Sequence, residues 1–129
     1  MISGMNHFTI LTQDLDATLA FYERFLDLHA GDRPDLGFPG AWMYAKGGSD
    51  PILHIVAGRP MPEEPEGVID HMAFTASGLA QTLVQLEARG LDFDCRQLPR
   101  DGTWQVFFFD PNGARVELDF AASEDPKLG

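Results

Sequence analysis

The sequence predicts an α+β fold built from two copies of one βαβββ module, and two observations carry this prediction. The first is a repeat of potential metal ligands. The interval from His7 to His71 is almost the same as the interval from His54 to Glu117. The second is that strand-like and helix-like hydrophobic patterns follow one another in the same order in both halves. The chain is therefore expected to be an internal duplication.

The first module is expected to cover about residues 4–58. It starts with a β-branched and aromatic strand at 6–11, and Asp14 is a plausible N-cap for the helix that follows. Leucine and tyrosine recur at helical spacing from Leu15 to Leu26, and Gly31 is expected to end this helical segment. After a loop rich in Gly, Pro and Asp, the remaining expected strands are 41–45 and 52–56.

Residues 59–67 contain three prolines and are expected to be a linker. The second module, about 68–120, repeats the plan: a strand at 69–75, a helix capped by Ser77 and ended by Gly90, and strands at 93–95, 104–109 and 114–120. We expect the tail, 121–129, to be frayed. Each half is too small to bury a core alone, so residues 1–129 are expected to form one domain.

Composition excludes several classes of function. The net charge is −11 and lysine and arginine do not cluster, which argues against nucleic-acid binding. No apolar stretch is long enough for a membrane span, and the start lacks the pattern of a signal peptide. The single cysteine, Cys95, fits a reducing cytoplasm. An anionic substrate would need a metal or scattered arginines such as Arg33, Arg59 and Arg100.

Three imidazoles and a carboxylate are a suitable donor set for a divalent metal. Residues two apart in a strand share a face, so His7 should lie on the face opposite Phe8 and Ile10. Glu117 should likewise lie opposite Val116 and Leu118. These polar faces are expected to line a concave cavity, with His7, His54, His71 and Glu117 as candidate ligands. His29 lies outside the repeat and is given no role.

Candidate substrate-binding residues lie on or near the same strands. Trp42, Tyr44 and Trp104 have polar edges that favour a wet or hydrogen-bonding neighbour, although core packing is the alternative for the aromatic residues. Thr9 should share a face with His7. Gln105 could hydrogen-bond a substrate or simply lie on the surface.

Several segments resemble the vicinal oxygen chelate superfamily, which includes glyoxalases, bleomycin-binding proteins and extradiol dioxygenases. The similar segments are 6–10, 14–16, 21–26, 70–74 and 109–118. The resemblance implies paired βαβββ modules in an open, curved barrel with mixed sheets and outer helices, enclosing one divalent ion (Zn, Ni, Mn, Co or Fe). His7, His71 and Glu117 match family ligand positions, and His54 lies where relatives place Glu, Gln or His. The resemblance also implies a homodimer.

Three functions are consistent with these features. The preferred one is a glyoxalase-like lyase or isomerase that chelates adjacent oxygens of a small metabolite, with Glu117 as both ligand and catalytic base. The second is an Fe(II) extradiol-type dioxygenase, with His54 outside the ligand set. The third is a non-enzymatic drug- or metabolite-binding protein. Leu11 and Gly58 stand where glutathione-dependent glyoxalases carry arginine and asparagine, which argues against lactoylglutathione formation.

Overall fold

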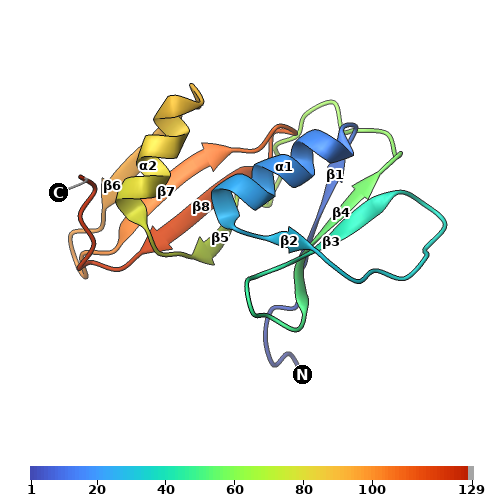
Figure 1. Cartoon of the computed structure of the whole chain (residues 1–129), viewed down its shortest axis with the longest axis horizontal. Coiled ribbons are helices and arrows are strands. Elements are labelled where there is room, and N and C mark those ends of the chain that lie inside the picture. Colours follow the sequence, from blue (N-terminus) through green and yellow to red (C-terminus); the bar gives the residue numbers. More distant parts are fainter. Residues whose placement is uncertain (128–129) are drawn as a thin grey trace. The chain divides into compact units, whose positions relative to one another are not determined.

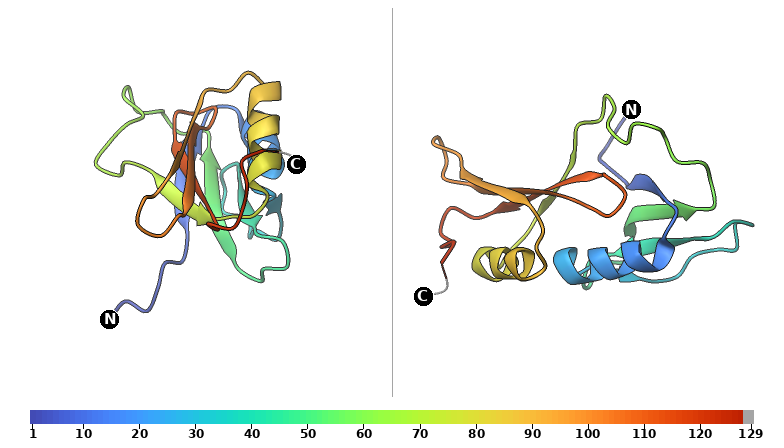
Figure 2. Two further views of the ribbon diagram at one scale, coloured as in Figure 1. Left: turned by 90° about the vertical axis from the view of Figure 1, so that its left-hand side faces the viewer. Right: turned by 90° about the horizontal axis from the view of Figure 1, so that it is seen from above.

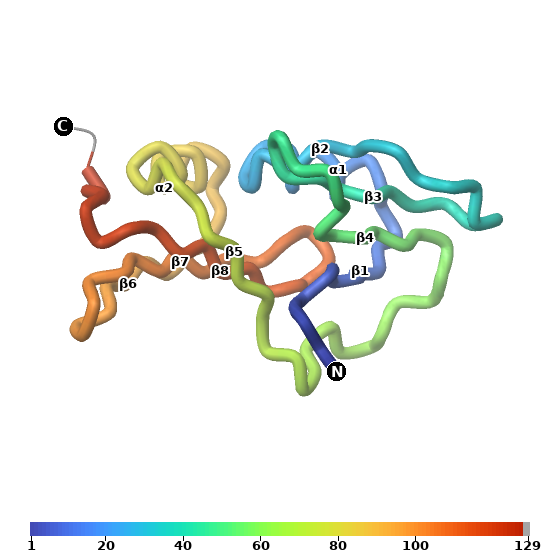
Figure 3. The backbone as a smooth tube through the Cα atoms, turned by 90° about the horizontal axis from the view of Figure 1, so that it is seen from below, coloured from blue at the N-terminus to red at the C-terminus, as the bar shows by residue number. Residues whose placement is uncertain are grey.

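The computed structural model describes residues 1–127, and within them the chain forms two units of the same topology (Figure 1). Each unit contains a strand, a helix and three further strands, so the predicted α+β fold with two βαβββ modules is confirmed. The first unit ends at Pro65 and the second begins at Glu66. This boundary lies inside the proline-rich segment that the sequence predicts as a linker, which Figure 3 shows as a long connection between β4 and β5.

The first unit contains β1 (Phe8–Thr12), α1 (Leu15–Leu26), β2 (His29–Ala30), β3 (Gly40–Tyr44) and β4 (Pro51–Ala57). Its sheet has the order β1-β4-β3-β2. Strand β1 is parallel to β4, whereas β3 is antiparallel to both β4 and β2. The first and last strands of the module are therefore neighbours.

The second unit contains β5 (Met72–Thr75), α2 (Leu79–Ala88), β6 (Phe93–Gln97), β7 (Trp104–Phe109) and β8 (Arg115–Phe120), in the sheet order β5-β8-β7-β6. Strand β5 is parallel to β8, and the other neighbours are antiparallel. Every element begins at one and the same interval after its counterpart: Phe8 and Met72, Leu15 and Leu79, His29 and Phe93, Gly40 and Trp104, Pro51 and Arg115. The repeat in sequence is thus a repeat in structure.

Each sheet has a buried face and a more open face. In β3, Ala41 and Met43 are buried, whereas Trp42 and Tyr44 between and after them are only half-buried. The buried faces hold the core of each unit, and Figure 2 shows each helix on one side of the strands of its own unit. The helices contribute Phe21 and Tyr22 from α1, and Leu79 and Leu86 from α2. The open faces carry the candidate ligands.

Helix α1 begins as predicted and ends earlier than predicted. The Asp14 side chain accepts a hydrogen bond from the Ala17 backbone N–H at 3.0 Å, which is N-cap geometry. The helix stops at Leu26, because Asp27 takes a left-handed conformation (φ 54°) that closes the C-terminus. Gly31 therefore does not end the helix. The residues between include the short strand β2, which the sequence did not predict.

Helix α2 is capped by a residue far away in sequence. The predicted cap, Ser77, is not the N-cap residue. Gly78 is the N-cap residue, with a φ of 88°. Oε1 of Glu124 accepts hydrogen bonds from the backbone N–H groups of Gly78 at 3.0 Å and Leu79 at 2.7 Å. The tail is therefore not frayed at Glu124, because it is tied to this helix, whereas residues 128–129 lie outside the described chain. Gly90, with φ 67°, follows the helix end as predicted.

Across residues 1–127, neither helix has the length and hydropathy that crossing a bilayer requires.

Candidate metal centre

The first unit brings His7 and His54 together. Their imidazole rings stack with centroids 3.6 Å apart and planes 11° apart. His54 lies on β4, where Thr9 of β1 and Trp42 of β3 are its cross-strand neighbours. The Trp42 ring stacks on His54 with centroids 4.4 Å apart. Three rings in succession therefore occupy the open face of this sheet.

The orientation of the His7 ring is set by its neighbour. Nδ1 of His7 lies 2.7 Å from Oδ1 of Asn6. A carbonyl oxygen can only accept, so Nδ1 carries the hydrogen and donates it. The lone pair of the neutral ring is then on Nε2, the atom available to a metal ion.

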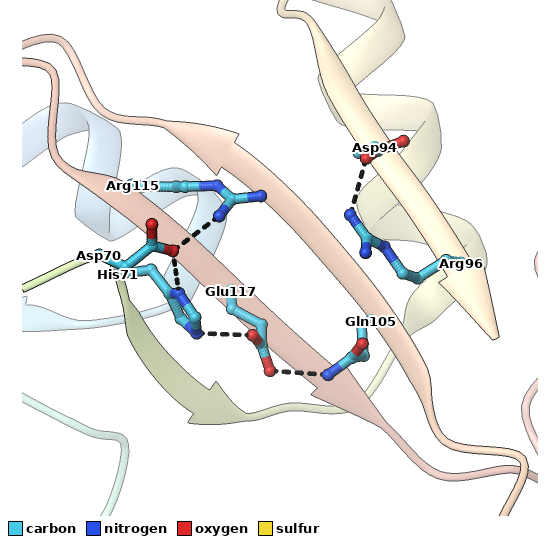
Figure 4. Close-up of polar contacts among 7 residues, drawn as sticks. All are labelled: Asp70, His71, Asp94, Arg96, Gln105, Arg115 and Glu117. Carbon is cyan, nitrogen blue, oxygen red and sulfur yellow. Dashed lines mark hydrogen bonds and ion pairs between the residues drawn. The ribbon is translucent and has the colours of Figure 1, made fainter. Parts of the chain in front are cut away.

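The second unit brings His71 and Glu117 together (Figure 4). Nε2 of His71 lies 2.9 Å from Oε1 of Glu117, whose residue exposure is only 5%. The other carboxylate oxygen, Oε2, accepts a hydrogen bond from Nε2 of Gln105 at 3.1 Å. His71 immediately precedes β5, whereas Glu117 lies on β8 and Gln105 on the adjacent strand β7. Glu117 is thus held on both sides by polar groups on the open face.

His71 also has a partner on its opposite ring nitrogen. Nδ1 lies 2.7 Å from Oδ2 of Asp70, and the same oxygen accepts a hydrogen bond from Nη1 of Arg115 at 2.8 Å (Figure 4). The Arg115 guanidinium lies over the Phe107 ring, 4.4 Å from its centroid. A carboxylate behind a histidine is the usual device that orients a metal-binding imidazole and raises its basicity.

The electrostatics of the two pairs differ. Burial, together with the neighbouring Asp119 carboxylate, raises the pKa of Glu117, and the His71 and Gln105 contacts oppose this rise only in part. Burial lowers the pKa of His54, and the charges of His7 and Arg33 lower it further. A low pKa favours the neutral imidazole, which is the form that binds metals.

The two pairs have the chemistry of a metal site, because imidazole nitrogen and carboxylate oxygen together suit first-row divalent ions. Among residues 1–127, no group of three or more His, Cys, Asp or Glu side chains is arranged so that it could hold a metal ion. The described structure therefore contains the four candidate ligands as two pairs, His7 with His54 and His71 with Glu117.

The predicted substrate-binding residues fall into two groups. Thr9 and Trp42 lie beside His54, and Gln105 contacts Glu117. Tyr44 uses its hydroxyl to donate to the backbone oxygen of Asp32 at 2.6 Å, which anchors the β2–β3 loop. Trp104 alternates with Gln105 along β7 and so faces the other side of the sheet.

Sequence reasoning did not identify Asn6, Asp70 or Arg115 as part of the site. A signal for the first two was present, because Asn6 and Asp70 occupy equivalent positions of the repeat and both carry a side-chain oxygen immediately before a histidine. Nothing in the sequence pattern marked Arg115, whose contact with Asp70 depends on the pairing of β5 with β8.

A sequence model described as the glyoxalase/bleomycin resistance protein/dioxygenase superfamily matches residues 4–118. The chain belongs to this superfamily. Among curated relatives, Glyoxylase I 4 of Arabidopsis thaliana is 29% identical over 127 residues, which cover 91% of this chain and 70% of the relative. The duplicated modules described above are therefore those of a known family.

Solved structures of similar fold include the fosfomycin resistance protein FosX from Listeria monocytogenes. Its hexagonal crystal form matches with a TM-score of 0.73 and 20% identity, and the match covers 98% of this chain and 99% of that one. A FosX mutant complexed with Mn(II) and 1S,2S-dihydroxypropylphosphonic acid matches with a TM-score of 0.72 and 20% identity, over 94% of both chains. A putative glyoxalase family protein from Bacillus anthracis has a TM-score of 0.73 at 18% identity, over 94% of this chain and 97% of that one. At these identities the likeness concerns the fold.

Proposed function

We propose that this protein is a divalent-metal-dependent enzyme of the glyoxalase-like type, a lyase or isomerase that acts on a small metabolite with two adjacent oxygen atoms. The observation that carries the proposal is the duplicated arrangement of ligands. Each module presents a histidine whose Nδ1 is already bonded, by Asn6 or Asp70, beside a second donor residue, His54 or Glu117. Two pairs supply the three or four protein ligands that a catalytic metal needs.

In this proposal, His7, His71 and Glu117 are ligands and His54 is the fourth. The bound ion would act as a Lewis acid on the two substrate oxygens. Glu117 is the residue suited to proton transfer, because its buried carboxylate has a raised pKa and so accepts a proton more readily than an exposed one. Gln105 holds Oε2 of Glu117 and thereby limits the carboxylate's rotation. Trp42 and Thr9 are proposed to contact the substrate beside His54.

The comparisons support the metal and the substrate class at a coarse level. Members of the superfamily bind divalent metal, as in the FosX mutant with Mn(II), and the ligand in that complex carries two hydroxyl groups on neighbouring carbons. We extend to this chain the metal dependence and the preference for adjacent oxygens, but not the reaction of that relative.

The proposal also includes a homodimer. One experiment decides whether the two ligand pairs that bind one metal ion come from the same chain or from two different chains. A His7→Ala chain and a Glu117→Ala chain are each expected to bind metal weakly. If the site is shared between chains, refolding them together creates heterodimers with one intact site, and metal binding returns in part. If each chain builds its own site, mixing restores nothing. Light scattering measures the oligomeric state of the wild type.

Catalysis is tested by proton exchange. Metal-loaded protein should exchange the hydrogen next to a carbonyl with solvent deuterium in at least one 2-hydroxy or 2-oxo compound of a panel, as measured by NMR. Glu117→Gln should abolish this exchange, whereas His29→Ala, outside the site, should not affect it. Oxygen uptake with catechols by Fe(II)-loaded protein would instead favour a dioxygenase. Ligand binding that is indifferent to EDTA would favour a binding protein.

A further inference from the structure

We propose that Arg33, assisted by Arg59, binds an anionic oxygen group of the substrate, a carboxylate or a phosphate, beside His54. This inference rests on the proposed function, because it adds a charged group to the substrate whose adjacent oxygens bind the metal. The proposed substrate class is therefore an acid or phosphate ester that also carries a hydroxy-oxo or diol unit.

Arg33 has one buried polar atom without a hydrogen-bond partner among the described residues. Its Nη2 donates to the backbone oxygen of Phe38 at 2.9 Å. Its Nε is buried and has no hydrogen-bond partner among residues 1–127. A buried N–H of a charged group that lacks an acceptor is costly, and native structures rarely keep one without a reason. A ligand oxygen at the guanidinium would remove that cost.

Two positive charges lie near the Phe38 ring without an acidic partner among the described ion pairs. The guanidinium carbons of Arg33 and Arg59 lie 5.2 and 4.9 Å from the centroid of the same Phe38 ring. Although the chain has 20 acidic residues, neither arginine forms an ion pair within the described range 1–127. An anion bound beside this ring would be attracted by both charges.

The loop that carries Arg33 is anchored at several points. The N–H of Gly31 donates to the Trp42 oxygen at 3.0 Å, and the N–H of Ala57 donates to the Pro39 oxygen at 2.9 Å. The Tyr44 hydroxyl donates to the Asp32 oxygen at 2.6 Å. These bonds attach both ends of the loop to β3 and β4. Arg33 is therefore held in place before a ligand arrives, which lowers the entropic cost of binding.

Arg33 lies on the face of β3 that carries the stacked rings. A Cβ atom placed on Gly40 would lie 3.1 Å from Nη2 of Arg33. Gly40 and Trp42 are two residues apart on β3 and so share a face, and the Trp42 ring stacks on His54. The positive charge of Arg33 also contributes to the lowered pKa of His54. A ligand held by Arg33 would thus extend over Trp42 towards His54.

Arginine is well suited to this role. Its planar guanidinium forms paired hydrogen bonds with carboxylate or phosphate oxygens, and these charge-assisted bonds are stronger than neutral ones. Lysine would keep the charge without this geometry. Arg33→Lys should therefore retain only part of the affinity, and Arg33→Gln should lose nearly all of it.

The test uses the full chain without metal, titrated with inorganic phosphate and with acetate, and it follows the side-chain Nε–H signals of the arginines by NMR. We expect the Arg33 Nε–H signal to shift with at least one probe. Arg33→Gln should weaken binding by about tenfold or more, as loss of a charged hydrogen bond implies. The matched control is Arg24→Gln, which removes the same charge from α1 in the same unit and should change affinity little.

The outcomes separate this proposal from the proposed function. A response to acetate alone assigns a carboxylate, and a response to phosphate alone assigns a phosphate; both support the subsite. No shift with either probe, or an equal loss in Arg24→Gln and Arg33→Gln, overturns it. Because the titration needs no metal, a chain that fails to bind metal but passes this test refutes the metal site and leaves the anion site standing.

Discussion

Oδ2 of Asp70 lies 2.7 Å from Nδ1 of His71 and is itself held by Arg115 (Figure 4). The equivalent residue of the first module is Asn6, a neutral acceptor at the same 2.7 Å from His7. Asp70→Asn makes the pair at His71 chemically equivalent to the Asn6–His7 pair, and it removes the negative charge next to the His71 ring. We expect metal affinity, measured by calorimetry, to fall by about 10- to 100-fold, the usual effect of losing such a partner.

The second unit offers a matched control for this substitution. Asp94 also pairs with an arginine, Arg96, at 2.9 Å, and makes no contact with His71 among the described interactions (Figure 4). Asp94→Asn removes the same charge, so its metal affinity should stay near that of the wild type. Equal losses in the two variants would mean that Asp70 acts only through net charge, and the orienting role would then be wrong.

Glu117 should make the metal-free protein less stable at neutral pH. Its pKa in the folded chain is raised above the ordinary 4.5, chiefly by burial. The folded state therefore holds this proton more tightly than the unfolded state, and that contribution is complete below pH 4.5 and is lost as the pH rises through the folded pKa. Glu117→Gln, which stays neutral, should have a higher Tm than the wild type at pH 7.

This difference in Tm between Glu117→Gln and the wild type should close as the pH falls below 4.5, where Glu117 is protonated in both states. Calorimetry over a pH series measures it, and Glu87→Gln, on the exposed side of α2, serves as the control. A difference that stays constant with pH, or a wild type that is the more stable protein at pH 7, would contradict the proposed cost of the buried carboxylate.

Glu124 should stabilise α2 from outside the module. Its carboxylate accepts two hydrogen bonds from the otherwise unpaired N–H groups of Gly78 and Leu79. Glu124→Ala should lower the free energy of unfolding by about 1–2 kcal/mol, as loss of a helix cap does. Urea unfolding measures this loss. Asp125→Ala, next in the chain and exposed, should change stability by much less, and an equal effect would refute the capping role.

The module plan was predictable because it depends on local patterns. Alternating apolar residues define the strands, and the Asp14 cap and the glycine after α2 define helix ends. The unpredicted features depend on contacts between distant segments or on unusual backbone. Helix α1 ends earlier than predicted because Asp27 takes a left-handed conformation. The N-terminus of α2 is capped by Glu124 instead of Ser77, through a hydrogen bond from Gly78, which is distant from Glu124 in the sequence. Local propensity carries no information about such partners.

The residues of the candidate site also fall into those that the sequence predicts and those that it does not. The repeat marked the four candidate ligands, and the structure pairs them as His7 with His54 and His71 with Glu117. The residues behind them were harder to find. Arg115 reaches Asp70 only because β8 pairs with β5, and Arg33 lies beside Gly40 only because its loop is anchored to β3 and β4. Cross-strand neighbours of this kind follow from the register of the sheet.

The most direct test of the proposed metal centre is an anomalous-scattering map of crystals grown with a divalent metal. We predict one strong peak per site, bounded by the ring nitrogens of His7 and His71 and by the carboxylate of Glu117, with His54 as the fourth ligand. The same map shows whether these residues come from one chain or from two. A peak that touches none of them, or a fully loaded protein whose metal lies elsewhere, would contradict the central claim.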